Sequence, residues 1–288
     1  VSYQNRACSG RRSSVRFALR SIGSHFLAAA LVLGVAIPAF AGAPKSPYDK
    51  YRNATYSNDG LMSEQEEMRL GAQVHQQVLQ KYQIVQDPEI AGYIQDLGER
   101  IAQSSKRPNI RYQFFVIDDS TVNAFALPGG YVYVHTGLLQ IARSEEELSA
   151  AIAHEIGHVV ARHGAEHIAK EQLTQGLTGA VVVASYDPNN PNSQYAAAFA
   201  ALVGQLVNLR YGRSDELESD TLGVRFMSQA GYDPNAMVRV MQILEESSSG
   251  GGQPEFFSTH PNPENRIARI QQAIAEQFPN GVPGGLTS

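Results

Sequence analysis

Hydrophobic residues recur every three or four positions along several stretches of the chain, and this spacing predicts amphipathic helices. Two of the stretches begin with a capping-box pattern, Ser63 with Glu66 and Ser144 with Glu147. The predicted helices cover about 63–82, 88–101, 144–164, 215–230, 234–246 and 264–278. The region 172–209 is rich in Ala, Gly and Val and is expected to form a helical hairpin with an irregular tip.

Two short runs, 112–117 and 131–134, are rich in β-branched and aromatic residues and predict strands. The loop between them contains Pro128-Gly129-Gly130. Few strands among many helices indicate a mostly helical α+β fold with a small sheet. We expect one domain over 63–279, preceded by an extended arm over 42–62 and followed by a flexible tail over 280–288, with a flexible linker inside the domain at 247–252.

Residues 1–41 differ from the rest of the chain in charge and hydrophobicity. Five arginines and no acidic residue precede the apolar run 26–40, the order typical of a signal peptide. Ala39-Phe40-Ala41 offers small residues at the spacing that signal peptidase requires, so cleavage before Gly42 is expected. The alternative is a retained membrane anchor, but Pro38 interrupts the run, which is shorter than the roughly 20 residues that span a bilayer.

Charge and cysteine content exclude some partners and some kinds of metal site. The chain has 23 basic and 28 acidic residues; without the five N-terminal arginines, 18 basic residues remain and the net charge is −10. Nucleic acid and anionic membranes are therefore not expected as partners. The one cysteine, Cys8, lies in the segment expected to be removed. Any zinc must then be held by histidines and carboxylates, which favours a catalytic site over a structural one.

The motif His154-Glu155-Ile156-Gly157-His158 carries the strongest chemical signal. Histidines four positions apart on a helix leave the same face and can bind one metal ion. Glu155 flanks this face and can accept a proton from the attacking water. A coincidental pair of core histidines is the alternative, expected in about one chain in a hundred of this length. The helical context and the capped helix start favour the metal site.

A catalytic zinc ion needs a third protein ligand and an open position for water. The metzincin pattern fails because Ala161 and Gly164 stand where that class has Gly and His. Glu171 lies too far along the predicted helix to turn back to the metal. Glu216 and Asp220 are four apart at the start of a later helix and share a face. We predict Glu216 as the third ligand and Asp220 as the acceptor of a hydrogen bond from a ligating imidazole.

Four sequence patches resemble those of the HtpX-like and BepA-like zinc metallopeptidases, relatives of the CaaX prenyl endopeptidases. They are Asn123-Ala124-Phe125-Ala126 with Pro128-Gly129-Gly130, the HEIGH motif, the run 216–220 after Tyr211-Gly212-Arg213, and Thr259-His260-Pro261 with Arg266. The resemblance covers most of 63–275 and implies a zincin-like domain with one zinc ion per chain. It is closest to the minimal, soluble, exported kind, which suggests the bacterial periplasm.

The resemblance also implies roles outside the zinc motif. A turn and an edge strand facing the active-site cleft would bind an extended peptide through main-chain hydrogen bonds, although an ordinary hairpin is the alternative. The residues concerned are Asn123, Ala124, Phe125, Ala126 and Gly130. His260 would lie near the metal, stabilising the oxyanion or occupying the open zinc position; a mere surface histidine is the alternative. Arg266 would bind substrate carbonyls or pair with Glu264 or another acid.

The remaining histidines and Glu218 are expected to have no part in the site. His163 and His167 are four apart, but neither is followed by a glutamate as His154 is, so we expect solvated side chains near a helix C-terminus. Glu218 should be a solvated surface charge. His75 and His135 have no companion at ligand spacing, and no function is expected for them.

The expected function is that of a zinc-dependent metalloendopeptidase acting on unfolded or misassembled exported proteins. Zinc would polarise the peptide carbonyl, while Glu155 takes a proton from water and passes it to the leaving nitrogen. Polypeptides are the expected partners, with an association with outer-membrane or membrane-protein assembly machinery. The alternative is a catalytically silent chaperone-like or scaffold module that keeps the zinc fold. The presence of Glu155 argues against that alternative.

Overall fold

A computed structural model describes residues 62–105, 107, 110–175, 185–186, 190, 194–248, 254–262 and 265–286. The predicted signal peptide, its cleavage site and the predicted arm as far as residue 61 lie outside the described residues, as do most of the hairpin tip between 176 and 193 and most of the predicted linker. Among the described residues, no helix is both long enough and apolar enough to cross a bilayer.

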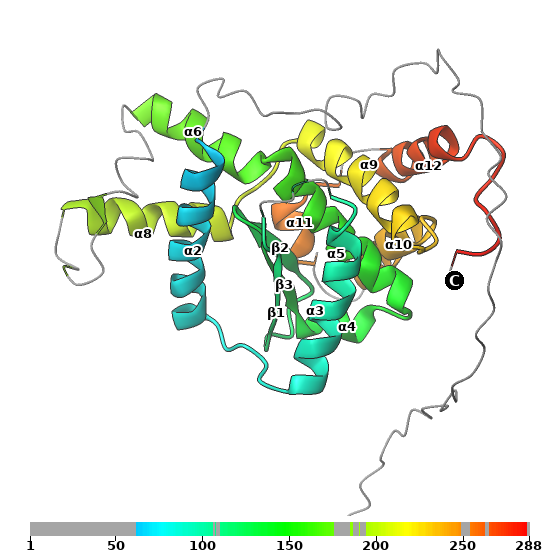
Figure 1. Cartoon of the computed structure of the whole chain (residues 1–288), viewed down its shortest axis with the longest axis horizontal. Coiled ribbons are helices and arrows are strands. Elements are labelled where there is room, and N and C mark those ends of the chain that lie inside the picture. Colours follow the sequence, from blue (N-terminus) through cyan, green and yellow to red (C-terminus); the bar gives the residue numbers. More distant parts are fainter. Residues whose placement is uncertain are drawn as a thin grey trace, which may run out of the picture. The chain divides into compact units, whose positions relative to one another are not determined.

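The described part of the chain is mostly helical, which confirms the predicted fold class. All the predicted amphipathic helices are present with their ends shifted by a few residues, apart from the one that should run to 164. Two short helices, α4 and α11, were not predicted. The helices are α2 (Glu64–Lys81), α3 (Pro88–Ala102), α4 (Thr136–Ile141), α5 (Glu145–Ala161), α6 (His163–Gln175), α8 (Gln194–Val207), α9 (Arg213–Gln229), α10 (Ala236–Ser248), α11 (Phe256–Thr259) and α12 (Arg266–Gln277) (Figure 1).

Side-chain caps start two of the helices where the sequence predicts them. At α2, the Ser63 hydroxyl accepts from the Glu66 N–H at 3.3 Å, and the Glu66 carboxylate accepts from the Ser63 N–H at 2.8 Å. At α5 only half of the predicted box forms. The Ser144 hydroxyl accepts from the Glu147 N–H at 3.3 Å, but the Glu147 carboxylate accepts from the preceding Arg143 N–H at 2.7 Å.

A three-stranded mixed sheet lies among these helices. Its strands are β1 (Gln113–Ile117), β2 (Ala124–Leu127) and β3 (Tyr131–His135), in the order β1-β3-β2. β3 is parallel to β1 and antiparallel to β2. β1 and β2 therefore form the edges of this sheet. The strand predicted at 131–134 is central, and the edge strand β2 was not predicted as a strand. The turn between them uses Gly129 and Gly130 at φ of +82° and +93°, where other residues would be strained.

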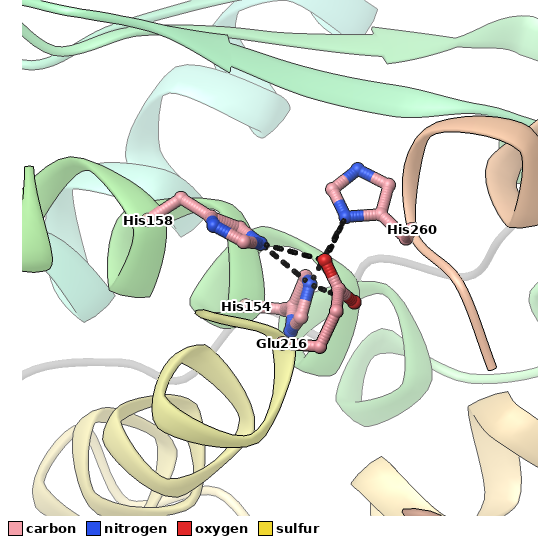
Figure 2. Close-up of side chains that lie close together, drawn as sticks. All are labelled: His154, His158, Glu216 and His260. Carbon is pink, nitrogen blue, oxygen red and sulfur yellow. Dashed lines mark hydrogen bonds and ion pairs between the residues drawn. The ribbon is translucent and has the colours of Figure 1, made fainter. Parts of the chain in front are cut away.

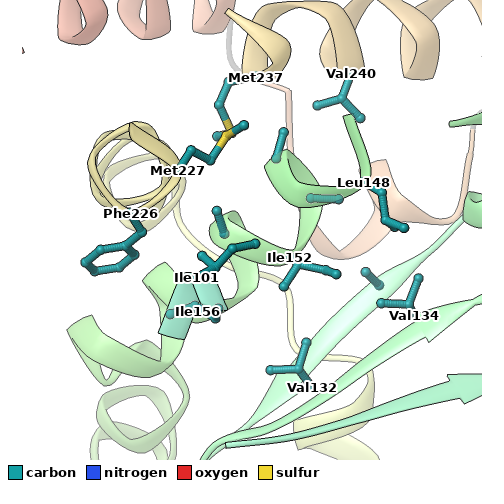
Figure 3. Close-up of a cluster of buried hydrophobic side chains, with 14 of the residues drawn as sticks. Ile101, Val132, Val134, Leu148, Ile152, Ile156, Phe226, Met227, Met237 and Val240 are labelled. Carbon is teal, nitrogen blue, oxygen red and sulfur yellow. The ribbon is translucent and has the colours of Figure 1, made fainter. Parts of the chain in front are cut away.

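The sheet is buried on both faces, which explains why its strands read as short continuous apolar runs. Val132 and Val134 of β3 belong to the cluster that also contains Ile152 and Ile156 of α5, and Figure 3 shows them together. Tyr133 belongs to a second cluster with residues of α2 and α8. Alternation along β3 thus separates a face toward α5 from a face toward α2 and α8.

Close backbone contact brings the two helices of the predicted metal site together. A Cβ atom on Gly157 of α5 would lie 2.5 Å from the hydroxyl of Ser219 on α9, and one on Gly223 would lie 3.3 Å from the backbone nitrogen of His154. The Ser219 hydroxyl donates to the carbonyl of His154. Small residues at this crossing therefore set the separation between the HEIGH motif and the run 216–220.

α5 ends at Ala161, not near 164 as predicted, because Arg162 adopts a left-handed conformation with φ of +63°. Three contacts hold this turn. The Arg162 guanidinium donates to the Glu67 carboxylate at 2.8 Å and to the carbonyl of Met62, and Arg107 donates to the carbonyl of Val159 at 2.8 Å. Contacts with distant parts of the sequence thus override the local helical pattern, and α6 leaves in a new direction.

Candidate metal centre

Side chains from three segments converge in the interior beside α5, and Figure 2 shows them pointing toward one another. Each offers one nitrogen or oxygen atom, and the four atoms lie within 4.8 Å of one another. The residues are His154 and His158 of α5, Glu216 of α9, and His260, which follows α11. The structure therefore brings together the three ligands predicted from the sequence and adds His260 as a fourth donor.

The spacing of these donors suits a tetrahedral metal ion. Zinc bonds of the usual length place neighbouring donors roughly 3.3 Å apart. The Nε2 atoms of His154 and His158 are 3.0 Å apart, and they lie 3.5 and 3.4 Å from the carboxylate oxygens of Glu216. The Nδ1 atom of His260 lies 3.3 Å from His154 Nε2 and 3.1 Å from Glu216 Oε1. Two imidazoles and a carboxylate are also a donor set that zinc prefers.

Asp220 and Arg266 hold the first histidine and the carboxylate of this cluster. Asp220 Oδ1 lies 2.9 Å from Nδ1 of His154, which leaves Nε2 directed at the other donors. Arg266 binds Asp220 with two nitrogens, at 2.7 and 2.8 Å, and reaches Glu216 Oε2 with a third at 3.0 Å. Of the two expectations for Arg266, the structure therefore shows pairing with acids.

His163 lies at the centre, and the prediction of a solvated side chain is wrong for it. The left-handed turn at Arg162 carries His163 back toward α5, where its Nδ1 lies 2.9 Å from Nδ1 of His158. Burial lowers the pKa of His163 to about 4, so the ring is neutral at pH 7 and can accept a hydrogen bond. His167 is only half-buried and pairs with Asp215 at 2.8 Å.

Tyr211 is a site residue to which no role was assigned from the sequence. Its buried ring stacks on that of His158, with the centroids 3.8 Å apart and the planes at 20°. It also lies against the ring of His260, at 5.4 Å. The available signal was its place in Tyr211-Gly212-Arg213, immediately before the helix that carries Glu216.

His260 is fully buried, so the surface alternative is wrong. Its ring stacks on Phe256 with the centroids 4.4 Å apart, and its backbone N–H donates to the Phe256 carbonyl at 2.7 Å. Its Nε2 lies 3.4 Å from Oε1 of Glu155. The short helix α11 therefore holds this ring between the two glutamates of the centre.

The two buried glutamates of the centre, Glu155 and Glu216, have pKa values shifted in opposite directions. Burial raises the pKa of Glu155, although the neighbouring His260 and His154 oppose the shift. Burial would also raise the pKa of Glu216, but the charge of His260 and hydrogen bonds from His154 and His158 hold it well below its ordinary value. Glu155 is thus the stronger base of the two, as a residue that accepts a proton requires.

The proposed substrate residues divide between two faces of the sheet. Ala124 and Ala126 lie on the face toward α5, and Ala126 lines a cavity of about 10 Å³ together with His158. Phe125 points to the opposite face and stacks on Tyr133, with the centroids 4.7 Å apart. Gly130 lies in the turn beside Ile110, and Asn123 bonds the adjacent backbone N–H at 2.9 Å. Phe125 and Gly130 are therefore not side-chain components of the centre.

Comparison with known proteins yields a family and several relatives. The model for "Peptidase family M48" matches residues 88–274. The chain is 31% identical over 264 residues to the beta-barrel assembly-enhancing protease of Escherichia coli, covering 88% of this chain and 52% of that protein. It is 29% identical over 230 residues to the protein of that name from Yersinia pestis, covering 78% and 47%.

A relative from a eukaryote carries a different name. The mitochondrial metalloendopeptidase OMA1 of Schizosaccharomyces pombe is 35% identical over 185 residues, covering 64% of this chain and 53% of that protein. The chain spans about half the length of the curated relatives it matches. The family match includes the HEIGH motif, Glu216 and His260. The resemblance to the HtpX-like and BepA-like enzymes is thereby confirmed, and the chain belongs to peptidase family M48, a family of zinc metallopeptidases.

Proposed function

We propose that this protein is a zinc-dependent metalloendopeptidase in which His154, His158 and Glu216 bind one zinc ion. The observation that carries the proposal is the convergence of these donors at tetrahedral spacing on two helices whose crossing is fixed by small residues. Glu155 lies beside them as a buried carboxylate, and neither of its oxygens accepts a hydrogen bond from the residues that the structure describes. It is therefore available to handle a proton.

Each residue has a distinct task in peptide hydrolysis. A zinc ion, when bound, supplies Lewis acidity toward a peptide carbonyl and toward water. Glu155 takes the proton from the attacking water and delivers it to the leaving nitrogen, for which its raised pKa suits it. Asp220 keeps His154 in the tautomer with Nε2 toward the metal, and His163 does the same for His158. Arg266 fixes the positions of the Asp220 and Glu216 carboxylates relative to each other.

Replacing Glu155 by glutamine tests the proposal. The substitution keeps the shape of the side chain and removes the base, so cleavage of unfolded casein is expected to fall by about 10²–10⁴-fold. Zinc content, measured by elemental analysis, should stay at one ion per chain. Failure of the zinc-loaded wild type to cleave, equal to that of Glu155→Gln, would favour the chaperone-like or scaffold module instead.

His260 separates two mechanisms for the open position. Its Nδ1 lies 3.3 Å from Nε2 of His154, which is where a fourth donor stands, so the geometry favours a resting form closed by this ring. His260→Ala is then expected to increase casein cleavage. A loss of cleavage with retained zinc would assign His260 to oxyanion stabilisation.

The natural substrates are proposed to be unfolded or misassembled exported proteins. Two bacterial relatives are named for enhancing β-barrel assembly, and residues 1–41 have the order of charged and apolar residues typical of a signal peptide. Together these favour a role in protein quality control in the bacterial periplasm, in association with outer-membrane assembly machinery. The edge strand β2 is the proposed docking site for an extended substrate.

A further inference from the structure

A cavity of about 430 Å³ adjoins the metal centre. One wall is the segment 210–213, which leads into α9, and the other is formed by Phe257, Pro261 and Asn262. The Tyr211 N–H donates to the Thr259 carbonyl at 3.1 Å, which joins the two walls. The cavity thus lies between the segment that leads into α9, the helix of Glu216, and the segment around α11, which includes His260 of the metal centre.

The same segments carry residues of the centre, so the cavity is close to the proposed point of cleavage. Tyr211 lines the cavity and stacks on the ligand His158 at 3.8 Å. Pro261 directly follows His260, and Glu216 lies in the first turn of α9. A peptide whose carbonyl reaches the metal would therefore have neighbouring residues within reach of this cavity.

Two arginines give the cavity its charge. Arg210 and Arg213 are both exposed, and among the described residues neither forms an ion pair or a side-chain hydrogen bond. Arg107, Arg162 and Arg266, in contrast, each bind a carboxylate. The nearest acid in sequence, Asp215, already bonds the Gly212 N–H and His167.

The position of Arg213 runs against helix stability. It is the first residue of α9, where the positive end of the helix dipole disfavours a cation. The positive charge of Arg213 is therefore not explained by the stability of α9. Binding of an anionic ligand in the cavity would explain it, because a guanidinium and a carboxylate form paired, charge-assisted hydrogen bonds.

We propose that Arg210 and Arg213 form a carboxylate-binding subsite, so that the enzyme prefers substrates with a carboxylate near the scissile bond. The inference rests on the proposed peptidase function and specifies its substrate class. The carboxylate belongs to an Asp or Glu side chain or to the substrate C-terminus, since both present the same group. The rings of Tyr211 and Phe257 provide an apolar wall for the methylene groups of a glutamate.

The first test uses the zinc-loaded full chain and peptides that differ at one position. The peptides carry Glu, Gln or Lys beside a site cleaved in casein, each with a free or an amidated C-terminus. The subsite predicts a kcat/KM for the Glu peptide about tenfold above that for the Gln peptide, with the Lys peptide lowest. The ratio of the Glu to the Gln value should fall when the salt concentration rises from about 50 to about 500 mM, because salt screens the attraction between exposed charges. A preference for Glu over Gln that holds in amidated peptides assigns the group to the side chain. Glu and Gln peptides that are cleaved equally, both faster with a free than with an amidated C-terminus, assign it to the C-terminus; either outcome supports the subsite.

Variants tie the preference to the cavity. The double change Arg210→Gln with Arg213→Gln should abolish the discrimination between Glu and Gln peptides while cleavage of the Gln peptide changes little. Arg143→Gln is the matched control, because Arg143 is an exposed arginine that pairs with Glu246 at 2.7 Å and does not line this cavity. Loss of discrimination in the control as well would show a general charge effect and overturn the subsite.

A binding measurement separates this inference from the proposed activity. Fluorescent Glu, Gln and Lys peptides are titrated with Glu155→Gln protein, which needs no cleavage to report affinity. Tighter binding of the Glu peptide that is lost in the double arginine variant supports the subsite even if the wild type cleaves nothing. Equal affinities for all three peptides, unchanged when the C-terminus is amidated, overturn it, whether or not the wild type is active.

Discussion

Two buried networks of acids and arginines touch α5, and they differ in their balance of charge. In the first, Glu67 receives Arg107 at 3.0 and 3.1 Å and Arg162 at 2.8 Å, while Glu64 adds a second acid 3.5 Å from Arg107. In these contacts of the described residues, two acids face two guanidiniums. Both oxygens of Glu67 have partners, and the network joins α2 to the end of α5.

The second network is the metal centre, where acids outnumber arginines. Glu155, Glu216 and Asp220 are all buried, and in the described part of the chain Arg266 is the guanidinium that pairs with two of them, Glu216 and Asp220. With the three carboxylates ionised and the histidines neutral, as ligands of a metal ion would be, the excess is two negative charges, which one Zn²⁺ ion would balance. Burial would lower the pKa of His154, but Asp220 and Glu216 raise it to about 9. Similar residues thus form a self-sufficient structural network in one place and a network suited to a cation in the other.

Removing the shared acid of the first network should have the largest effect on stability. Glu67→Gln deletes the carboxylate on which two buried guanidiniums converge, so the free energy of unfolding is expected to fall by about 3–5 kcal/mol. Urea denaturation measures the change. Glu246→Gln, which removes an exposed pair, should cost less than about 1 kcal/mol. Equal small losses in both variants would contradict the structural role of Glu67.

Metal removal should reveal the charge excess of the second network. Free zinc at 100 times its dissociation constant is expected to stabilise the folded chain by about 2.7 kcal/mol over chelator-treated protein. Thermal unfolding with chelator and after zinc is added back measures the shift. The same shift is expected on top of the loss in Glu67→Gln, because the two networks share no side chain, whereas Glu216→Gln should lose most of it. If zinc did not change the unfolding temperature of the wild type, the second network would not be a zinc site.

The two networks also differ in how far the sequence predicts them. The convergence of the HEIGH motif with Glu216 could be predicted, because helical spacing decides which side chains share a face and a helix start locates the proposed third ligand. The role of His163 could not be predicted from the sequence. It depends on the left-handed Arg162, which is held by Glu67, a residue 95 positions away in the chain. The pairing of Arg266 with two acids from α9 likewise depends on tertiary packing that no local pattern records.

The sheet shows the same limit. Runs of β-branched and aromatic residues predict β1 and β3, but β2 has only four residues, two of them alanines. Its pairing depends on the Gly129-Gly130 turn, which folds the chain back antiparallel onto β3. The order of the strands, with β3 central, follows from the parallel pairing of β1, for which a sequence pattern of this length carries no signal.

The two histidines of the proposed zinc site offer a finer comparison, since a carboxylate lies beside one ring and a neutral imidazole beside the other. Asp220 lies 2.9 Å from Nδ1 of His154, and His163 lies 2.9 Å from Nδ1 of His158. Loss of such partners weakens metal binding by about 10–100-fold. We expect His163→Ala near the lower end and Asp220→Asn near the upper end, measured by competition with a chromophoric chelator. His163→Asn, which keeps an acceptor, should restore part of the affinity; unchanged affinity in His163→Ala would remove His163 from the site.

The smallest effect separates two neighbouring glutamates, because Glu67 lies inside the first network while Glu66 caps α2 near its surface. Hydrogen bonds from the side chain and backbone of Ser63 lower the pKa of Glu66. A carboxylate whose pKa is depressed on folding stabilises the protein above its unfolded value, about 4.3, and loses that contribution as the pH falls through the folded value. Glu66→Ala should therefore cost roughly 0.5 kcal/mol at pH 7 and nothing measurable near pH 2. Glu66→Gln, an uncharged acceptor, should show no such pH dependence, and a gap from wild type that persists in acid would mean that packing, rather than the charged cap, explains the cost.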